Sequence, residues 1–169
     1  MEEARIINAK FQSGDKGLMA LWHHIMSVSK TDIKRIYDRL NTTFEIWNGE
    51  SDEMEYFDDL KKIYEDMNLL TDSEGARVVE VATEDDKAPM PPVLVRKRNG
   101  AQIYATTDLA TIKQRVEDFN PSMILYFVDN RQGLHFEQVF RCARKTGLVS
   151  EDVHLEFDGF GTMNGKDGK

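Results

Sequence analysis

Six consecutive apolar residues, from Met123 to Val128, constrain the fold of this chain more than any other segment. Such a continuous run is typical of a parallel strand that is covered on both faces. Apolar residues recur at helical spacing before it, from Leu109 to Phe119, and after it, from Phe136 to Ala143. An alternating segment, Val153 to Phe157, predicts one more strand. Helix, buried strand, helix and strand in this order predict half of a doubly wound, Rossmann-like parallel sheet.

Residues 1–74 show the periodicity of helices. Apolar side chains recur there in three stripes at helical spacing, which we interpret as facing a core. These stripes are Leu18–Ile25, Ile33–Leu40 and Met54–Tyr64. Ser29 and Asp32 are placed like a capping box, so a separate helix is predicted to begin there.

Strand-like segments precede the apolar run in the second part of the chain. They are Arg77–Val81, Pro92–Lys97 and Ala101–Ala105. The last two flank Arg98-Asn-Gly100, a turn signal that predicts a β-hairpin. We therefore predict an α/β fold in two parts: a mainly helical insertion over residues 1–74, and the second half of a Rossmann-like domain over residues 75–169.

Composition narrows the class of protein. The chain has 169 residues, enough for one domain with a core and a modest insertion. It has no apolar stretch of the about 20 residues that a membrane helix needs, and its N-terminus lacks the features of a signal peptide. A single cysteine, Cys142, suits a reducing cytoplasm and is interpreted as a packing residue. The net charge of −8 argues against a main nucleic-acid docking surface on this chain.

One sequence motif precedes the apolar run Met123–Val128, and a second motif follows it. The first is Tyr104-Ala-Thr-Thr-Asp108-Leu-Ala, preceded by Asn99-Gly100, and the second is Gln132-Gly-Leu-His135-Phe. They resemble the second half of the catalytic domain of arginyl-tRNA synthetases, whose patterns are close to Y-x-T-R-D-[LI]-A and Q-x-x-H-F. One position departs from the family pattern: Thr107 stands where the family usually has arginine.

The resemblance implies that Tyr104, Asp108 and Gln132 bind arginine, and it makes His135 a candidate for the ATP pocket. The residue types suit a guanidinium, a planar cation with five donors, which needs a carboxylate, further acceptors and a flat wall. Gln132 and His135 also follow the predicted strand at its carboxyl end, where doubly wound sheets bind ligands. No side chain is assigned a catalytic or metal-binding role.

Each of the four residues also has a simpler interpretation. Asp108 could be a first-turn acid that complements a helix dipole. Tyr104 could be a packing residue at the end of a strand, and Gln132 could be a solvated loop residue. His135 could simply form hydrogen bonds at the start of a helix.

The resemblance implies an enzyme that activates arginine with ATP, accompanied by Mg²⁺, and transfers it to tRNA(Arg). The family's first signature, H-x-G-H, and its anticodon-binding domain are not found in this sequence. We therefore expect an internal fragment that is inactive alone, with most tRNA contacts outside it. The segment Gly159–Lys169 fails as a phosphate loop, because Phe160 and Asp167 occupy required positions; it resembles the approach to the family's second signature loop.

Two other classes of function stay open at the level of sequence. One is a non-catalytic α/β module that binds partners or a small cation through its acidic surface, in which Tyr104, Asp108 and Gln132 would point to different places. The other is a synthetase-like enzyme for another amino acid. Lysine has the right charge, but it lacks the planar fork that a carboxylate and an amide recognise together.

Overall fold

A computed structural model describes residues 2–49, 52, 56–96, 104–162 and 164–167. The chain divides into two compact units, Met1–Trp47 and Asn48–Lys169. The functional division predicted between residues 74 and 75 lies inside the second unit and stays a prediction. Each unit has its own arrangement of helices and strands.

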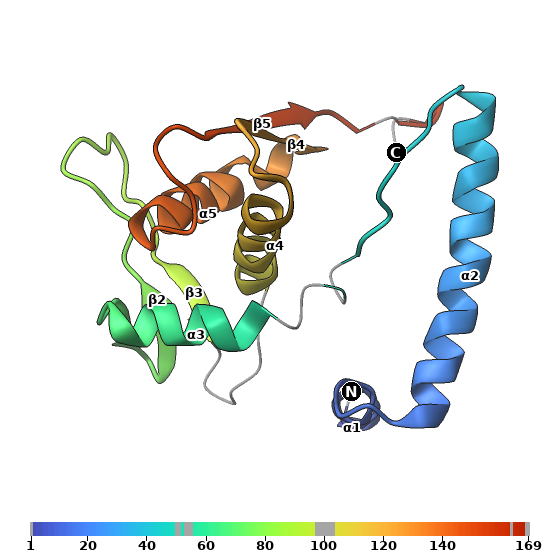
Figure 1. Ribbon diagram of the computed structural model, residues 1–169, viewed down its shortest axis with the longest axis horizontal. Helices are drawn as coiled ribbons and strands as arrows, with labels where there is room; N and C mark the ends of the chain where they lie inside the picture. The colour runs from blue at the N-terminus through green and yellow to red at the C-terminus, as the bar shows by residue number, and fades with distance from the viewer. Residues whose placement is uncertain (1, 50–51, 53–55, 97–103, 163, 168–169) are drawn as a thin grey trace. The chain divides into compact units, whose positions relative to one another are not determined.

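The first unit consists of two helices, α1 (Glu2–Gln12) and α2 (Lys16–Arg39), followed by a segment without regular structure (Figure 1). Asp15 caps the second helix. Its Oδ1 accepts hydrogen bonds of 3.0 Å from the backbone N–H groups of Gly17 and Leu18. These donors have no partner within the helix, so the cap stabilises its first turn.

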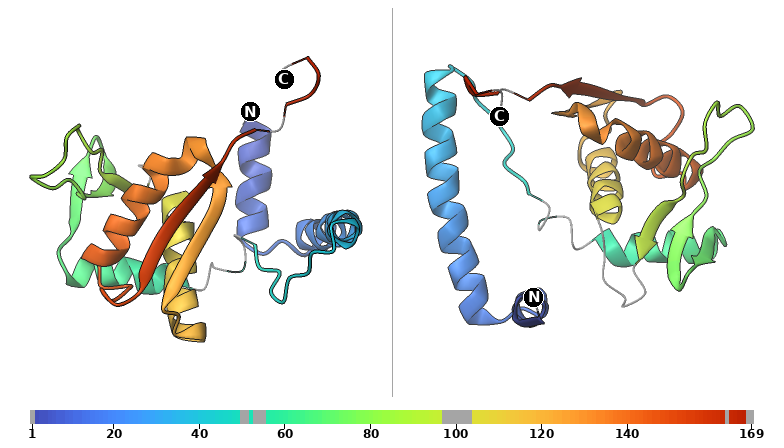
Figure 2. Two further views of the ribbon diagram at one scale, coloured as in Figure 1. Left: turned by 90° about the horizontal axis from the view of Figure 1, so that it is seen from above. Right: turned by 180° about the vertical axis from the view of Figure 1, so that it is seen from behind.

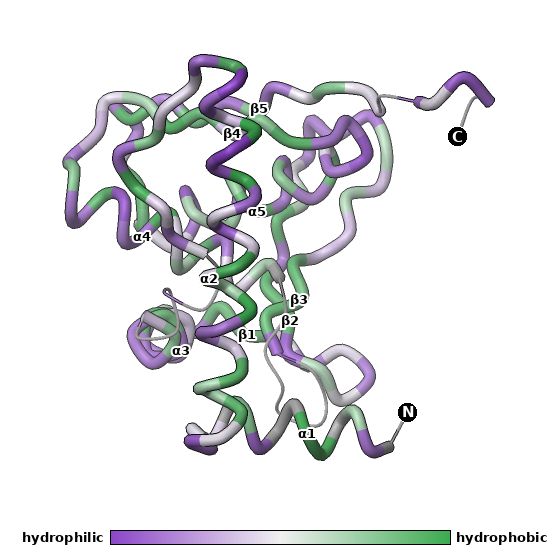
Figure 3. The backbone as a smooth tube through the Cα atoms, turned by 90° about the vertical axis from the view of Figure 1, so that its right-hand side faces the viewer, coloured by the Kyte–Doolittle hydropathy of each residue, from purple (hydrophilic) through white to green (hydrophobic). Residues whose placement is uncertain are grey.

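Helix α2 is one uninterrupted helix without a buried residue. The separate start predicted at Ser29 and Asp32 is wrong, because no glycine or proline breaks the helix after Gly17. The predicted core role of its apolar side chains is wrong as well, because none of them is buried in the described structure: α2 is much longer than α1, which cannot cover its whole length. Figure 3 shows apolar and polar residues alternating along α2. The exposed members of the predicted stripes are Leu21, Ile25, Ile33, Ile36 and Leu40. None of the helices in the described residues is long and apolar enough to cross a membrane.

The second unit begins with a helix and a three-stranded antiparallel sheet, in the spatial order β1-β2-β3. These elements are α3 (Phe57–Asp66), β1 (Leu70–Ser73), β2 (Ala76–Val79) and β3 (Val93–Arg96). A two-residue turn joins β1 to β2, with φ of 52° at Glu74 and 79° at Gly75. Two positive φ angles in succession match the right-handed twist of the flanking strands. The turn therefore fixes the pairing of Ser73 with Ala76.

Strands β2 and β3 confirm two of the predicted strands, but the rest of this region differs from the prediction. Strand β1 falls in the part predicted as mainly helical, because its sequence, Leu-Thr-Asp-Ser, has too few apolar residues to show a period. Most of the hairpin predicted around Arg98-Asn-Gly100 lies outside the described residues. Its predicted second strand is wrong at Tyr104 and Ala105, which form the start of a helix.

The rest of the second unit confirms the predicted half of a doubly wound sheet. Its elements are α4 (Tyr104–Phe119), β4 (Met123–Asp129), the short 3-10 helix η2 (Asn130–Gln132), α5 (Gly133–Lys145) and β5 (His154–Phe160). Strands β4 and β5 pair in parallel, with Tyr126 opposite Phe157. Helices α4 and α5 lie on the same side of these two strands (Figures 1 and 2). The predicted ends of both helices are confirmed: α4 stops before Asn120-Pro121, and Gly147 follows α5 with φ of 68°.

The hydrophobic core of this unit joins α3, the antiparallel sheet, α4, α5 and strand β4. Six side chains are almost completely inaccessible, and they come from α3, β2, α4 and α5. These are Leu60, Leu109, Ile112, Val79, Val139 and Cys142. The predicted core role of the stripe on α3 is thus confirmed at Leu60 and Tyr64, and so is the packing role of Cys142. Burial of each large side chain contributes roughly 1.5–3 kcal/mol.

Strand β4 is covered on one face only, contrary to the prediction for a continuous apolar run. Ile124 and Tyr126 are buried, whereas the side chains that alternate with them are exposed. The exposed face comprises Met123, Leu125 and Phe127. The physical reason is that α4 and α5 both lie on the other side of the strands (Figure 1).

Candidate functional site

Helix α4 places Asp108 in its second turn. The described helix begins at Tyr104, so Asp108 is not among its first-turn residues, and the simpler role proposed for it as a first-turn acid is wrong. The adjacent residue, Leu109, is completely buried in the core. This burial fixes the rotation of α4 about its axis and therefore the direction in which position 108 faces. Tyr104 lies one turn earlier on the same helix, but its side chain is outside the described part of the chain.

The structure brings Asp108 together with His135. His135 Nε2 and Asp108 Oδ2 are 2.6 Å apart. An ionised carboxylate can only accept, so Nε2 carries the proton and donates it. The Asp108 side chain is 27% exposed, and the His135 side chain is 29% exposed. The carboxylate is thus held by a hydrogen bond on a side chain that is still partly exposed.

Helix α5 holds His135 through the buried residue that follows it. Phe136 is buried, and its ring lies 5.2 Å from the His135 imidazole at an interplanar angle of 80°. Such an edge-to-face contact restricts the orientation of both rings. Phe136 also contacts Tyr126 of β4 and Phe157 of β5, with ring centroids 4.6 and 5.7 Å apart. The imidazole is therefore positioned by the core of the parallel sheet.

Gln132 ends η2 at the start of α5, beyond the carboxyl end of β4. It is exposed and occupies the N-cap position of α5, but its side chain makes no capping hydrogen bond. Its amide is not used by the helix start. Gln132 at the N-cap and His135 in the first turn are three residues apart at the start of α5. Whether Gln132 contacts a ligand stays a prediction.

A second carboxylate near this loop is already neutralised within the chain. Asp129 caps η2 by accepting from the backbone N–H of Arg131 at 2.9 Å, and both its oxygens accept from the Arg131 guanidinium at 2.8 Å. These hydrogen bonds lower the pKa of Asp129 to about 2. Sequence reasoning missed this pair, although an Asp after a strand followed by polar residues is a signal for such a turn.

The glycine at position 159 lets β5 approach the loop that carries Gln132. A Cβ atom at Gly159 would collide with the side-chain oxygen of Asn130 and approach the Phe157 ring to 2.9 Å. Asn130 is the first residue of η2. The absence of a side chain at Gly159 therefore leaves room for the Asn130 side chain of η2 beside β5.

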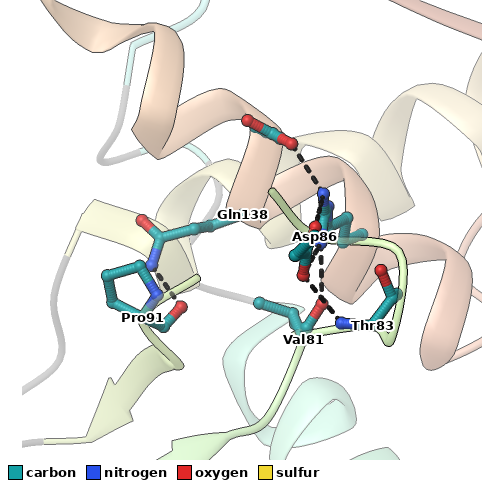
Figure 4. A network of polar contacts seen from close by, with 7 residues as sticks. Val81, Thr83, Asp86, Pro91 and Gln138 are labelled. Carbon is teal, nitrogen blue, oxygen red and sulfur yellow. Dashed lines mark hydrogen bonds and ion pairs between the residues drawn. The ribbon is translucent and has the colours of Figure 1, made fainter. Parts of the chain in front are cut away.

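Arg141 of α5 joins this helix to the connection between β2 and β3, where Figure 4 labels its partners Val81 and Asp86. Its guanidinium donates to both carboxylate oxygens of Asp86, at 2.8 and 2.6 Å, and also to Glu137 and the carbonyl of Val81. The hydrogen bonds from Arg141, and a further one from the backbone of Thr83, lower the pKa of Asp86 to about 2. This network positions α5, and it was not predicted from the sequence.

Among the residues that the structure describes, no group of three histidine, cysteine, aspartate or glutamate side chains is arranged to hold a metal ion. The last predicted motif, the segment Gly159–Lys169, includes Lys166 in its described part, where it is exposed. No described contact gives Lys166 a role.

The parallel strand–helix–strand unit β4–α5–β5 is half of a doubly wound α/β domain, the class of fold whose ligands bind beyond the carboxyl ends of the strands. All 169 residues match the family described as tRNA synthetases class I (R), catalytic domain, and the chain belongs to this family. It is 52% identical over its whole length to an arginine–tRNA ligase of Alkaliphilus oremlandii, and 47% identical over 168 residues to one of Agathobacter rectalis. The chain spans 29% and 28% of the length of these two relatives. A solved arginyl-tRNA synthetase from Plasmodium falciparum superposes with a TM-score of 0.81 at 26% identity, covering 92% of this chain and 27% of that one.

Proposed function

We propose that this chain forms the arginine-binding part of an arginine–tRNA ligase. The observation that carries the proposal is the Asp108 carboxylate, which is fixed by His135 and remains accessible next to the start of α5. A carboxylate held in one orientation is the group that a guanidinium recognises best. The family match supports the same substrate, because curated relatives over the whole chain are arginine–tRNA ligases.

Each predicted ligand has a distinct part in recognition. Asp108 supplies the negative charge, the amide oxygen of Gln132 supplies a further acceptor, and Tyr104 supplies a ring and a hydroxyl. A charge alone would not separate arginine from lysine. A carboxylate together with an amide matches the planar fork of arginine, which an ammonium cannot fill.

The proposed reaction takes place between substrates that the whole enzyme holds. The carboxylate of arginine attacks the α-phosphorus of ATP, which enters with Mg²⁺ bound to its phosphates, and pyrophosphate leaves. The terminal ribose hydroxyl of tRNA(Arg) then attacks the arginyl carbonyl and releases AMP. This chain contributes by fixing the arginine side chain, which orients the reacting carboxylate. The proposed setting is the cytoplasm, with tRNA contacts mainly outside this chain.

A hybrid enzyme tests the proposal. In this hybrid, the 169 residues of the chain replace the matching segment of the Alkaliphilus oremlandii ligase. The two segments are 52% identical over all 169 residues. Aminoacylation of tRNA(Arg) is measured with arginine and with lysine, and thermal unfolding checks that the hybrid folds. We expect arginine to be the preferred substrate. A folded hybrid that charges no arginine, or charges lysine equally well, would refute the proposal.

A further inference from the structure

The contact between His135 and Asp108 points to a role for His135 on the amino-acid side of the pocket. We propose that His135 is a positioning residue for arginine: it holds Asp108 Oδ2, so that Asp108 presents Oδ1 to the guanidinium. This inference rests on the proposed function and deepens it. It differs from the expectation, drawn from the family resemblance, that His135 belongs to the ATP pocket.

Asp108 needs such a partner because packing alone does not fix its carboxylate. The side chain is 27% exposed, and among the described residues His135 is its only hydrogen-bond partner. Without the imidazole, the carboxylate could rotate about its two side-chain torsions. The hydrogen bond of 2.6 Å uses one lone pair of Oδ2 and leaves Oδ1 free for a second donor. A guanidinium can therefore bind without breaking the contact to His135.

His135 is suited to this task because its own position is rigid. It sits on the first turn of α5, and the next residue, Phe136, packs against Tyr126 and Phe157 of the parallel sheet. The core thus places the donor before any ligand arrives, which lowers the entropic cost of binding.

The same hydrogen bond argues against a contact between His135 and ATP. His135 uses Nε2 in its contact with Asp108, and the hydrogen of one ring nitrogen serves one strong acceptor at a time. The oxygens of a triphosphate also need donors. A histidine whose Nε2 is bonded to the Asp108 carboxylate is thus not free to donate from that nitrogen to the phosphates.

Substitutions of His135 in the hybrid enzyme test this inference. With His135→Ala, we expect the KM for arginine to rise about tenfold, the loss typical of one hydrogen bond to a charged group, while the KM for ATP stays within about twofold. His135→Gln should bring the KM for arginine back to within about threefold of that of the unsubstituted hybrid, since the glutamine amide nitrogen can occupy the position of the imidazole Nε2. His135→Asn is the matched control, because its shorter amide does not reach Asp108.

Several outcomes would overturn the inference. A rise in the KM for ATP instead of arginine would return His135 to the nucleotide side. Equal arginine KM values for the glutamine and asparagine variants would show that the hydrogen bond does not matter. If kcat falls equally in all variants and the midpoint of thermal unfolding falls as well, the role of His135 is purely structural. The unsubstituted hybrid keeps these failures separate from a failure of the proposed function, because it must charge arginine for the comparison to be made.

Discussion

At the scale of single residues, the carboxylates around the site differ in what they are bonded to. Asp86 and Asp129 each bind an arginine of the same chain, and the pKa of each is lowered to about 2. Their charge is therefore already compensated. Asp108 contacts His135, and no described lysine or arginine forms an ion pair with it. For this reason we propose Asp108, and not Asp86 or Asp129, as the partner of a cationic ligand.

Cys142 provides a prediction about reactivity. Its side chain is completely buried in α5, and burial raises the pKa of its thiol to about 12. Because the thiolate is the reactive form, we expect negligible labelling by a thiol reagent at pH 8 in the folded protein and complete labelling in denaturant. Rapid labelling without denaturant would contradict the packing role of this cysteine.

Leu109 links the site to the core and gives a prediction about stability. It is completely buried next to Asp108, whereas Leu134, next to His135, is 52% exposed. We expect Leu109→Ala to lower the free energy of unfolding by about 2–5 kcal/mol through the cavity it leaves. The matched control, Leu134→Ala, should cost far less. Urea unfolding measures both, and equal losses would show that the two leucines are packed alike.

At the scale of elements, the ion pair between Arg141 and Asp86 ties α5 to the segment that joins β2 to β3. The hydrogen bonds from Arg141 lower the pKa of Asp86 to about 2, below the ordinary value of about 3.9 in an unfolded chain. The unfolded state therefore takes up this proton first as pH falls. The contribution to stability is complete above about pH 4 and is lost as pH falls toward 2.

Replacement of this carboxylate tests the connection. We expect Asp86→Asn to lower the midpoint of thermal unfolding at pH 7 and to reduce the difference between pH 5 and pH 2.5. Asp85→Asn, a change of the adjacent exposed carboxylate, is the control. If the midpoint of thermal unfolding depends on pH in both variants as it does in the unsubstituted protein, the ion pair does not hold α5 in place.

The approach of β5 to η2 gives a second prediction at this scale. A Cβ at Gly159 would collide with Asn130, whereas a Cβ at Gly161 would have open space. In the hybrid enzyme, Gly159→Ala should displace η2, and with it Gln132, and raise the KM for arginine severalfold. Gly161→Ala should leave it unchanged. Equal KM values for the two variants would show that η2 does not depend on Gly159.

The sequence predicted those elements whose signal is local. Strand β4 is a continuous apolar run, α5 has apolar residues at helical spacing with Gly147 after it, and both were predicted closely. The start of α4 was missed because Tyr104 suits a strand at least as well as a helix. Contacts between distant residues leave no local signal: Asp108 and His135 are 27 positions apart, and Asp86 and Arg141 are 55 apart. The family resemblance named the site residues, but only the structure showed that two of them form a pair.

At the scale of the whole molecule, the chain supplies part of a doubly wound domain and spans less than a third of its relatives. Its two parallel strands carry helices on one side, and the other side of β4 is exposed. The proposed activity therefore belongs to a longer enzyme, in which this part selects the amino acid. Selection by Asp108 is the claim on which this assignment depends.

The most direct test is the kcat/KM of aminoacylation with arginine for the hybrid enzyme and its Asp108→Asn variant. The substitution keeps the shape of the side chain and removes its charge. We predict a loss of about a hundredfold, because the guanidinium would lose its charged partner, with the thermal unfolding midpoint nearly unchanged. An Asp108→Asn hybrid that charges arginine as efficiently as the unsubstituted hybrid would contradict the assignment of the arginine pocket.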